Sequence, residues 1–251
     1  MKLFVAVPVY RDIPAEFAMS LVNLVADRRC PFEISVNFLV GDSYVSKARN
    51  RLTTSFLKSD CSHLLWIDCD LVFTTQDIAR LVSHDKAIVG GMYCIKRPGY
   101  PHWLLDFLPD LPPRDERGLQ PLQHIGAGFL LIRRDVFERM IATYGPEIAY
   151  TDPVTRELDY NLWQTTIHKG HFYGEDYTFC ERARELGFQI FGDWNVILPH
   201  LGTASYPLRT FTPPEVAHCH ELLEAGNQNN KMQERERATE ALSRQNKGEG
   251  K

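Results

Sequence analysis

Residues 64–73 read Leu-Leu-Trp-Ile-Asp-Cys-Asp-Leu-Val-Phe, so that a short apolar run ends on two carboxylates. The run over 64–67 is too short for an independent helix and is typical of a strand buried inside a sheet. Asp68 and Asp70 follow it directly, and buried carboxylates are costly unless a cation meets them. Because ligands of open α/β sheets bind at the carboxyl ends of the strands, we expect a ligand site here.

Two carboxylates one residue apart favour a divalent metal that carries phosphate. Hard oxygen ligands suit Mg²⁺ or Mn²⁺, which take one or two carboxylates and complete their coordination with phosphate oxygens and water. The alternative is that Asp68 and Asp70 only cap the helix that follows, a common use of acids at a helix start. The remaining motifs decide between these two interpretations.

Strand-like and helix-like segments alternate over the first 93 residues. Strands are predicted where short apolar runs occur, and helices where apolar residues recur on one face. The predicted strands are 3–9, 33–40, 64–67 and 86–93, and the predicted helices are 14–28, 45–58 and 76–83. This alternation implies right-handed crossovers, and it predicts an α/β fold with a mostly parallel central sheet flanked by helices.

The alternation stops after residue 94. Six prolines fall within 95–121, which predicts a long functional loop. Order returns with a strand over 123–132 that has two glycines near its start. The later predicted elements are a helix over 134–143, a helix from Gly174 to about residue 186 that Gly187 ends, short strands over 188–191 and 196–198, a helix start at 212–215, and a polar tail beyond 226.

The overall composition excludes several classes of protein. The chain has 251 residues, 44% of them hydrophobic and 24% charged, as in a globular protein with a sizeable core. A net charge of -4 gives no global electrostatic case for nucleic-acid binding. We expect no transmembrane segment, and residues 1–10 lack the layout of a signal peptide. The six cysteines form no Cys-x-x-Cys pair, which favours reduced thiols, a cytoplasmic location and no zinc site.

Two further features bear on chemistry. Gly174, Glu175 and Asp176 open a predicted helix, where acids are stabilised by the helix dipole by about 0.3–1 kcal/mol each. That effect alone explains many such pairs, but a carboxylate held at a helix start can also act as a general base. His200 follows a short predicted strand. It is either a packed histidine or the ligand that completes a mostly oxygen-ligated Mn²⁺ site.

Taken in order, these motifs resemble the GT-A-fold glycosyltransferases, close to the family 2-like enzymes that use nucleotide-activated sugars. The resemblance spans roughly residues 1–210 and depends on the ordered combination, since each motif alone is weak. It implies a GT-A fold with a Rossmann-like nucleotide half and an acceptor half. The matching stretches are 5–10, 46–52, the Asp-x-Asp motif within 66–70, 89–93, 126–134, 174–183 and His200.

The resemblance implies a nucleoside-diphosphate sugar as donor, with a UDP-sugar favoured. Pro8, Val9 and Tyr10 are then implied to line the pocket for the base and the ribose. Asp42 is implied to hydrogen-bond the base. Arg49 is implied to face the nucleotide from the next helix, its alternative being a solvated helix face.

The resemblance also implies a metal site for Mn²⁺ or Mg²⁺. Asp70 is implied to bind the metal directly, with His200 as its protein partner. Asp68 is implied to approach the ribose or a metal-bound water. Cys69, between the two aspartates, is expected to contribute only packing or backbone contact to the donor site.

For the reaction, the resemblance implies Asp176 as the general base, with Glu175 as the fallback. A base opposite the leaving group fits in-line displacement with inversion at the anomeric carbon. Gly126 and Gly128 are implied to let the backbone approach the donor sugar or the acceptor. Their alternative is a bulge that merely bends the strand.

We therefore expect a glycosyltransferase domain over 1–212, with a nucleotide-sugar half (1–94) and an acceptor half (95–212), followed by a C-terminal helix and polar tail (213–251). The acceptor stays open among a glycan, a small molecule, a protein and a modified nucleobase. One competing function is a nucleotidyltransferase, which normally has a Gly-rich phosphate loop that residues 8–14 lack. The other is a non-catalytic nucleotide- or carbohydrate-binding module, against which the full set of acids argues.

Overall fold

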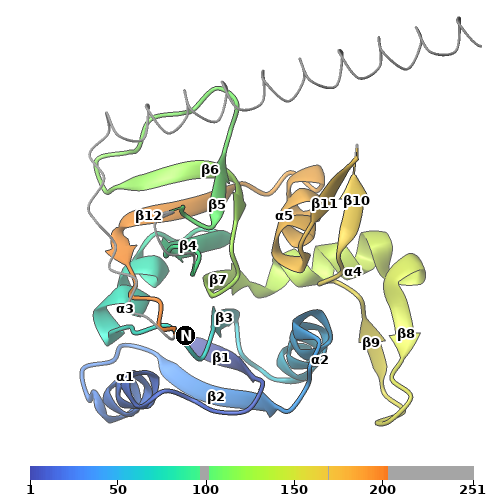
Figure 1. Cartoon of the computed structure of the whole chain (residues 1–251), viewed down its shortest axis with the longest axis horizontal. Helices are drawn as coiled ribbons and strands as arrows, with labels where there is room; N and C mark the ends of the chain where they lie inside the picture. Colours follow the sequence, from blue (N-terminus) through green and yellow to red (C-terminus); the bar gives the residue numbers. More distant parts are fainter. Residues whose placement is uncertain (97–101, 169, 203–251) are drawn as a thin grey trace, which may run out of the picture. The chain divides into compact units, whose positions relative to one another are not determined.

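The structure, a computed structural model, describes residues 1–96, 102–168 and 170–202. Its centre is an eight-stranded sheet with the order β2-β1-β3-β7-β4-β12-β6-β5 (Figure 1). The strands of this sheet are β1 (Lys2–Val9), β2 (Glu33–Val40), β3 (His63–Ile67), β4 (Ile88–Met92), β5 (Leu105–Phe107), β6 (Leu119–Ile125), β7 (Phe129–Arg133) and β12 (Ile190–Ile197). Two hairpins stand apart from it, β8 (Ala149–Thr151) with β9 (Leu158–Tyr160), and β10 (Thr166–His168) with β11 (His171–Tyr173).

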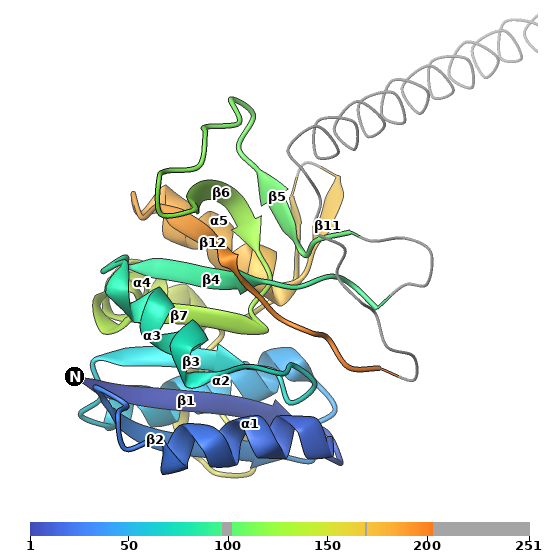
Figure 2. The same ribbon diagram turned by 90° about the vertical axis from the view of Figure 1, so that its left-hand side faces the viewer.

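Helices cover both faces of the sheet, because alternate residues of a buried strand point to opposite sides. Val5 of β1 packs in one core cluster with Phe17 and Ile78, whereas Phe4 meets Phe56 edge-on, 5.7 Å between ring centroids. Figure 2 shows α1 and α3 in front of the sheet. None of the helices in the described residues is long and apolar enough to cross a bilayer. The helices are α1 (Ala15–Ala26), α2 (Val45–Lys58), α3 (Thr75–Ser83), α4 (Arg134–Ile148) and α5 (Glu175–Glu185).

The first three strands end at the same edge of the sheet. β1 pairs in parallel with β2 from Lys2↔Glu33 to Val9↔Val40, and in parallel with β3 on its other side. β4 pairs in parallel with β12 further along. The chain segments that follow the carboxyl ends of β1, β2 and β3 therefore come together at this edge, which is where the predicted site residues lie.

The prediction of an α/β fold with a mostly parallel sheet is confirmed: six of the eight strands of this sheet run in one direction, and β6 and β7 run opposite to them. The parallel neighbouring pairs are β1–β2, β1–β3 and β4–β12. β7 runs antiparallel between β3 and β4, and β6 runs antiparallel between β5 and β12. The alternation of strands and helices in the first 93 residues predicted the parallel part, and the second half of the sheet has no such alternation.

The single strand predicted over 123–132 is two strands, β6 and β7, that run in the same direction. β6 pairs with β12, whereas β7 lies between β3 and β4. Between residues 125 and 129 the chain therefore crosses over from the position beside β12 to the position between β3 and β4. Tyr93, just after β4, fills this crossing. A Cβ on Gly126 or Gly128 would come within 2.3 or 2.7 Å of the Tyr93 side chain. The crossing therefore requires glycine, and the apolar pattern on either side does not reveal it.

Other boundaries also differ from the predictions. The loop predicted over 95–121 contains β5 and the start of β6, with Pro121 opposite Phe191 in the ladder. The two strands predicted over 188–191 and 196–198 form one strand, β12, with an irregularity between Asp193 and Ile197. The helix predicted over 134–143 continues through Pro146. The predictions for 212–215 and for the tail lie outside the described residues.

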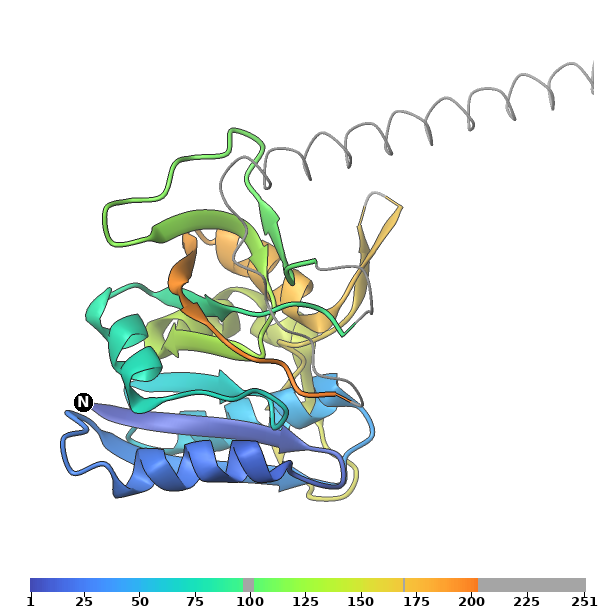
Figure 3. The ribbon, with the colours of Figure 1, turned by 60° about the vertical axis from the view of Figure 1, so that its left-hand side comes forward.

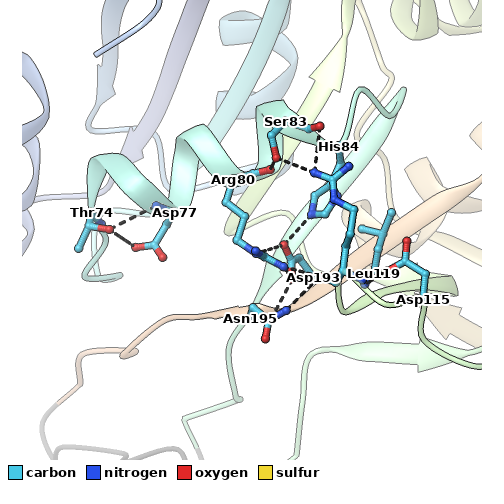
Figure 4. Close-up of polar contacts among 10 residues, drawn as sticks. Thr74, Asp77, Arg80, Ser83, His84, Asp115, Leu119, Asp193 and Asn195 are labelled. Carbon is cyan, nitrogen blue, oxygen red and sulfur yellow. Dashed lines mark hydrogen bonds and ion pairs between the residues drawn. The ribbon is translucent and has the colours of Figure 1, made fainter. Parts of the chain in front are cut away.

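A buried ionic network ties α3 to β12 (Figure 4). The Asp193 carboxylate is fully buried and meets Arg80 Nε at 2.6 Å and His84 Nε2 at 2.7 Å. The Asn195 N–H donates to the same carboxylate at 2.9 Å. At the other end of α3, Thr74 and Asp77 form a reciprocal capping box. The network anchors the strand that leads to His200.

We expect Asp193→Ala to reduce the free energy of unfolding by about 3 kcal/mol, because it leaves the buried His84 and the partly exposed Arg80 without their shared partner. The measurement is urea denaturation followed by circular dichroism. Thr74→Ala, which removes only the helix cap, serves as the comparison and should cost about 1 kcal/mol. A loss no larger than that of the cap variant would show that the network contributes little.

Candidate active site

Asp68 and Asp70 lie in the turn after β3, at the carboxyl edge of the sheet. The Asp68 N–H donates to the Gly128 carbonyl at 2.8 Å, and the Leu71 N–H donates to the Asp68 carbonyl at 3.1 Å. The Leu201 N–H donates to the Asp70 carbonyl at 2.7 Å. Backbone groups from three separate parts of the chain thus hold the two aspartates in place.

Arg49 of α2 is the buried cation of this site, with 3% of its surface exposed. Its Nη2 donates to Asp68 Oδ1 at 2.9 Å and its Nε to Glu175 Oε1 at 3.4 Å. The guanidinium also lies 5.0 Å from the ring centroid of Trp66 and 5.8 Å from that of Trp163. Burial disfavours its charge, but the two carboxylates outweigh burial and raise the pKa of Arg49 above its ordinary value. Arg49 therefore faces the acids of the site and does not line the cavity beside them.

Basic side chains surround Asp70. His200 Nε2 lies 3.3 Å from Asp70 Oδ1, and Lys96 Nζ contacts Asp70 Oδ2. His200 Nδ1 donates to the Cys94 carbonyl at 2.7 Å, which keeps a proton on Nδ1 and turns Nε2 toward Asp70. Burial raises the pKa of Asp70, but the contacts with His200 and Lys96 outweigh it and hold the pKa below its ordinary value.

Asp70 and His200 fit a divalent metal. Asp70 Oδ1 is buried and has no hydrogen-bond partner. Histidine ligands of metals ordinarily donate their other ring nitrogen to a carbonyl or carboxylate, as His200 does to Cys94. Among the described residues no three His, Cys, Asp or Glu side chains are grouped closely enough to hold a metal. Two protein ligands suit an ion that keeps phosphate oxygens and water in its remaining positions.

Glu175 and Asp176 open α5, directly after the hairpin β10–β11, which extends from the domain in Figure 3. Their environments differ, because Glu175 is paired with Arg49. Burial, together with the nearby charge of Glu175, raises the pKa of Asp176 to about 6, although Arg49 and the Tyr177 N–H act in the opposite direction. A pKa close to the working pH is what a general base requires. The two adjacent acids therefore differ in environment.

A cavity of about 220 Å³ opens beside the aspartates. It brings together seven of the residues expected at the donor site. They come from the ends of β1, β2 and β3, and are Pro8, Val9, Tyr10, Asp42, Asp68, Cys69 and Asp70. Ser43, Val45 and Ala48 complete the wall. The sequence interpretation missed these three, although their position at the start of the predicted helix 45–58 was the signal that places them beside Asp42.

Gly126 and Gly128 do not line this cavity, and the group that approaches them is Tyr93. The Gly128 N–H donates to Tyr93 Oη at 2.7 Å, and a Cβ on Gly128 would lie 3.0 Å from Asp68 Oδ2. Tyr93 is buried. Its role in supporting the backbone near Asp68 was missed from the sequence, because only the crossing of β6 into β7 brings the three residues together.

Comparison with known proteins locates the chain by its fold alone. No protein-family profile and no curated protein matches the sequence. Among solved structures, GalNAc-T7 with UDP, GalNAc and Mn²⁺ superposes with a TM-score of 0.50 at 11% sequence identity, over 84% of this chain and 45% of that one. The likeness shows that this chain has the GT-A glycosyltransferase fold.

Two further matches are weaker. The A197 protein from STIV gives a TM-score of 0.48 at 14% identity, over 84% of this chain and 100% of that chain. Residues 1–349 of S. aureus TarS give a TM-score of 0.40 at 16% identity, over 82% of this chain and 60% of that chain. The chain thus spans the whole of A197 but less than two thirds of the other two structures.

We expect Asp176→Asn to stabilise the fold at pH 7.5. Because the folded pKa of about 6 lies above the ordinary value of 3.8, the ionised carboxylate reduces stability progressively as pH rises from about 4 to 6, and the cost persists above that. A neutral amide removes it and can still accept the Tyr177 N–H, for a gain of about 1–3 kcal/mol. Thermal unfolding should show the gain at pH 7.5 and its disappearance near pH 4. A difference independent of pH would contradict the assignment.

Proposed function

We propose that this chain is a metal-dependent glycosyltransferase that moves a sugar from a nucleoside-diphosphate sugar to a hydroxyl acceptor with inversion. The observation that carries the proposal is the gathering of Asp68, Asp70, His200 and Asp176 at one edge of a GT-A sheet. Their environments differ: at Asp70 a carboxylate oxygen without a hydrogen bond lies 3.3 Å from His200 Nε2, and at Asp176 a partly buried carboxyl has a raised pKa. The acids come from positions far apart in the sequence.

The cavity at the ends of β1, β2 and β3 is proposed to hold the nucleotide. Asp42 lies at its wall and offers a carboxylate to the base, and its Oδ1 also accepts the Tyr44 N–H at 3.0 Å. Pro8, Val9 and Tyr10 also line this cavity. We favour a UDP-sugar as the donor, and the UDP and Mn²⁺ in the GalNAc-T7 structure support this choice.

The metal, Mn²⁺ or Mg²⁺, would be held by Asp70 and His200, with Asp68 beside it, and would neutralise charge on the departing diphosphate. The protein's own part is orientation. The hydrogen bond from His200 Nδ1 to the Cys94 carbonyl turns Nε2 toward Asp70. Arg49 donates to the Asp68 carboxylate and holds it in place.

Asp176 is proposed to take the proton of the acceptor hydroxyl. The acceptor oxygen forms a bond to the anomeric carbon while the bond from that carbon to the diphosphate oxygen breaks, and the electron pair leaves with the nucleoside diphosphate. Glu175 is poorly suited to this step because its carboxylate is engaged by Arg49. Arg49 therefore selects which of two adjacent acids is free to act as the base.

We propose a hydroxyl acceptor carried by a glycan, a small molecule, a protein or a modified nucleobase, and a domain that extends to about residue 212. A cytoplasmic location is part of the proposal, and the five free cysteines among the described residues support it.

A panel of sugar nucleotides tested with Mn²⁺ should contain a donor that raises the melting temperature. Saturation at about 100 times Kd adds about 2.7 kcal/mol to stability. Asp70→Asn should abolish the part of this shift in melting temperature that depends on Mn²⁺. It should also abolish hydrolysis of the donor to a nucleoside diphosphate. Asp60→Asn, at an exposed carboxylate paired with Lys2, is the control. Full donor hydrolysis by the Asp70 variant, or release of pyrophosphate, would refute the proposed reaction.

The rate of transfer should depend on pH through Asp176. Because the base must be ionised and its pKa is about 6, kcat should fall about tenfold per unit below pH 6 and level off above pH 7. Initial-rate measurements from pH 5 to 8 with saturating donor and Mn²⁺ test this. Asp176→Asn should lose transfer across the whole range while keeping donor binding. A rate that does not change between pH 5 and 7 would exclude Asp176 as the base.

A further inference from the structure

The Lys96 ammonium is already in contact with the carboxylate that the metal would use. Its Nζ meets Asp70 Oδ2, and both side chains are about one-third exposed, at 30% and 32%. Asp70 Oδ1, the other oxygen, has no hydrogen-bond partner. One oxygen of Asp70 is thus neutralised by a residue of the chain, while the other faces the imidazole of His200.

The backbone places Lys96 at this point. The backbone of Cys94 forms an antiparallel β-bridge with that of Trp103, and the Ile95 N–H donates to the His102 carbonyl at 2.9 Å. The Cys94 carbonyl also accepts from His200. The chain immediately before Lys96 is therefore fixed against the same segment that carries the second proposed metal ligand, so the contact between Lys96 and Asp70 follows from the fold.

The distribution of charge explains why Asp70 needs a cation of its own. Among the described residues, the Arg49 guanidinium close to these acids already pairs with Asp68 and Glu175. Lys96 is thus the positive group that balances Asp70. A divalent ion held by Asp70 would share this carboxylate with the ammonium, and like charges close together disfavour each other.

We propose that Lys96 is a built-in counter-ion of Asp70 that competes with the divalent metal for this carboxylate and turns to the donor diphosphate when the metal binds. The inference rests on the proposed metal-dependent function. Lysine suits this exchange because its compact charge is carried on a flexible four-carbon stem. Without the donor, the Lys96 ammonium neutralises Asp70. When the donor binds, its diphosphate receives the displaced ammonium, and metal binding at Asp70 becomes favourable.

The test is the affinity for Mn²⁺ alone, followed by the loss of the electron paramagnetic resonance signal of free Mn²⁺ as the protein is added. Lys96→Gln removes the competing charge and should bind Mn²⁺ at least about tenfold more tightly than the unchanged protein, a difference of about 1.4 kcal/mol. Lys96→Arg keeps the charge and should retain the original affinity. Lys58→Gln, at a lysine paired with exposed Glu157, is the matched control and should change nothing.

A second measurement follows the freed ammonium. With UDP present, Lys96→Gln should lose most of its advantage in Mn²⁺ affinity, because it lacks the group that meets the diphosphate, and its KM for the donor should rise several-fold. Merely structural damage would weaken Mn²⁺ binding in both conditions. Circular dichroism and the metal-free melting temperature of each variant confirm that it is folded.

The outcomes separate this inference from the proposed function. If the unchanged protein and Lys96→Gln bind Mn²⁺ equally, and Asp70→Asn binds none, the competition is refuted while the metal site stands. If Lys96→Gln binds more weakly, Lys96 supports the metal site and the inference is again wrong. If none of the variants binds Mn²⁺ with or without UDP, the metal-dependent function itself is overturned.

Discussion

The pairing of buried Arg49 with two carboxylates is the constraint on which the site depends. Asp68 follows β3 and Glu175 opens α5, 107 residues later in the chain, yet one guanidinium contacts both. A buried charge needs a partner of opposite sign, because removing one partner leaves the other charge unpaired in an apolar environment and lowers the stability of the fold. The rings of Trp66 and Trp163 complete its surroundings. The turn after β3 and the start of α5 are therefore held together by a single side chain.

This pairing also distinguishes residues that are chemically alike. Glu175 and Asp176 are adjacent acids, but Arg49 engages the first, while burial raises the pKa of the second to about 6. Asp68 and Asp70 divide similarly, since Arg49 holds Asp68 and leaves Asp70 to Lys96 and His200. Different surroundings thus give one site both a carboxylate held by a cation and a carboxyl with a raised pKa.

The parts of the fold that could be predicted are those with a local signal. The strand 33–40 and the helix 45–58 agree with the structure at both ends, because the apolar patterns and the flanking Gly41-Asp42 are local. The start of β6 was not predicted because it lies among prolines. β12 was predicted as two strands because Gly192 and Asp193 interrupt its apolar pattern, and the burial of Asp193 depends on Arg80 and His84. These strands owe their stability to partners far along the chain, so their own residues carry little signal.

The sequence by itself determined the kinds of groups in the site and their position at strand and helix ends, because periodicity and capping are set by neighbouring residues. It therefore placed Asp68 and Asp70 at an edge where ligands bind, and the resemblance to the GT-A-fold glycosyltransferases added Asp176 and His200. Only the tertiary structure decided which acid is paired and which is free. It turned Arg49 inward, set Tyr93 against Gly126 and Gly128, and brought Lys96 to Asp70. Charge pairing and burial depend on distances between residues remote in sequence, and folding alone sets those distances.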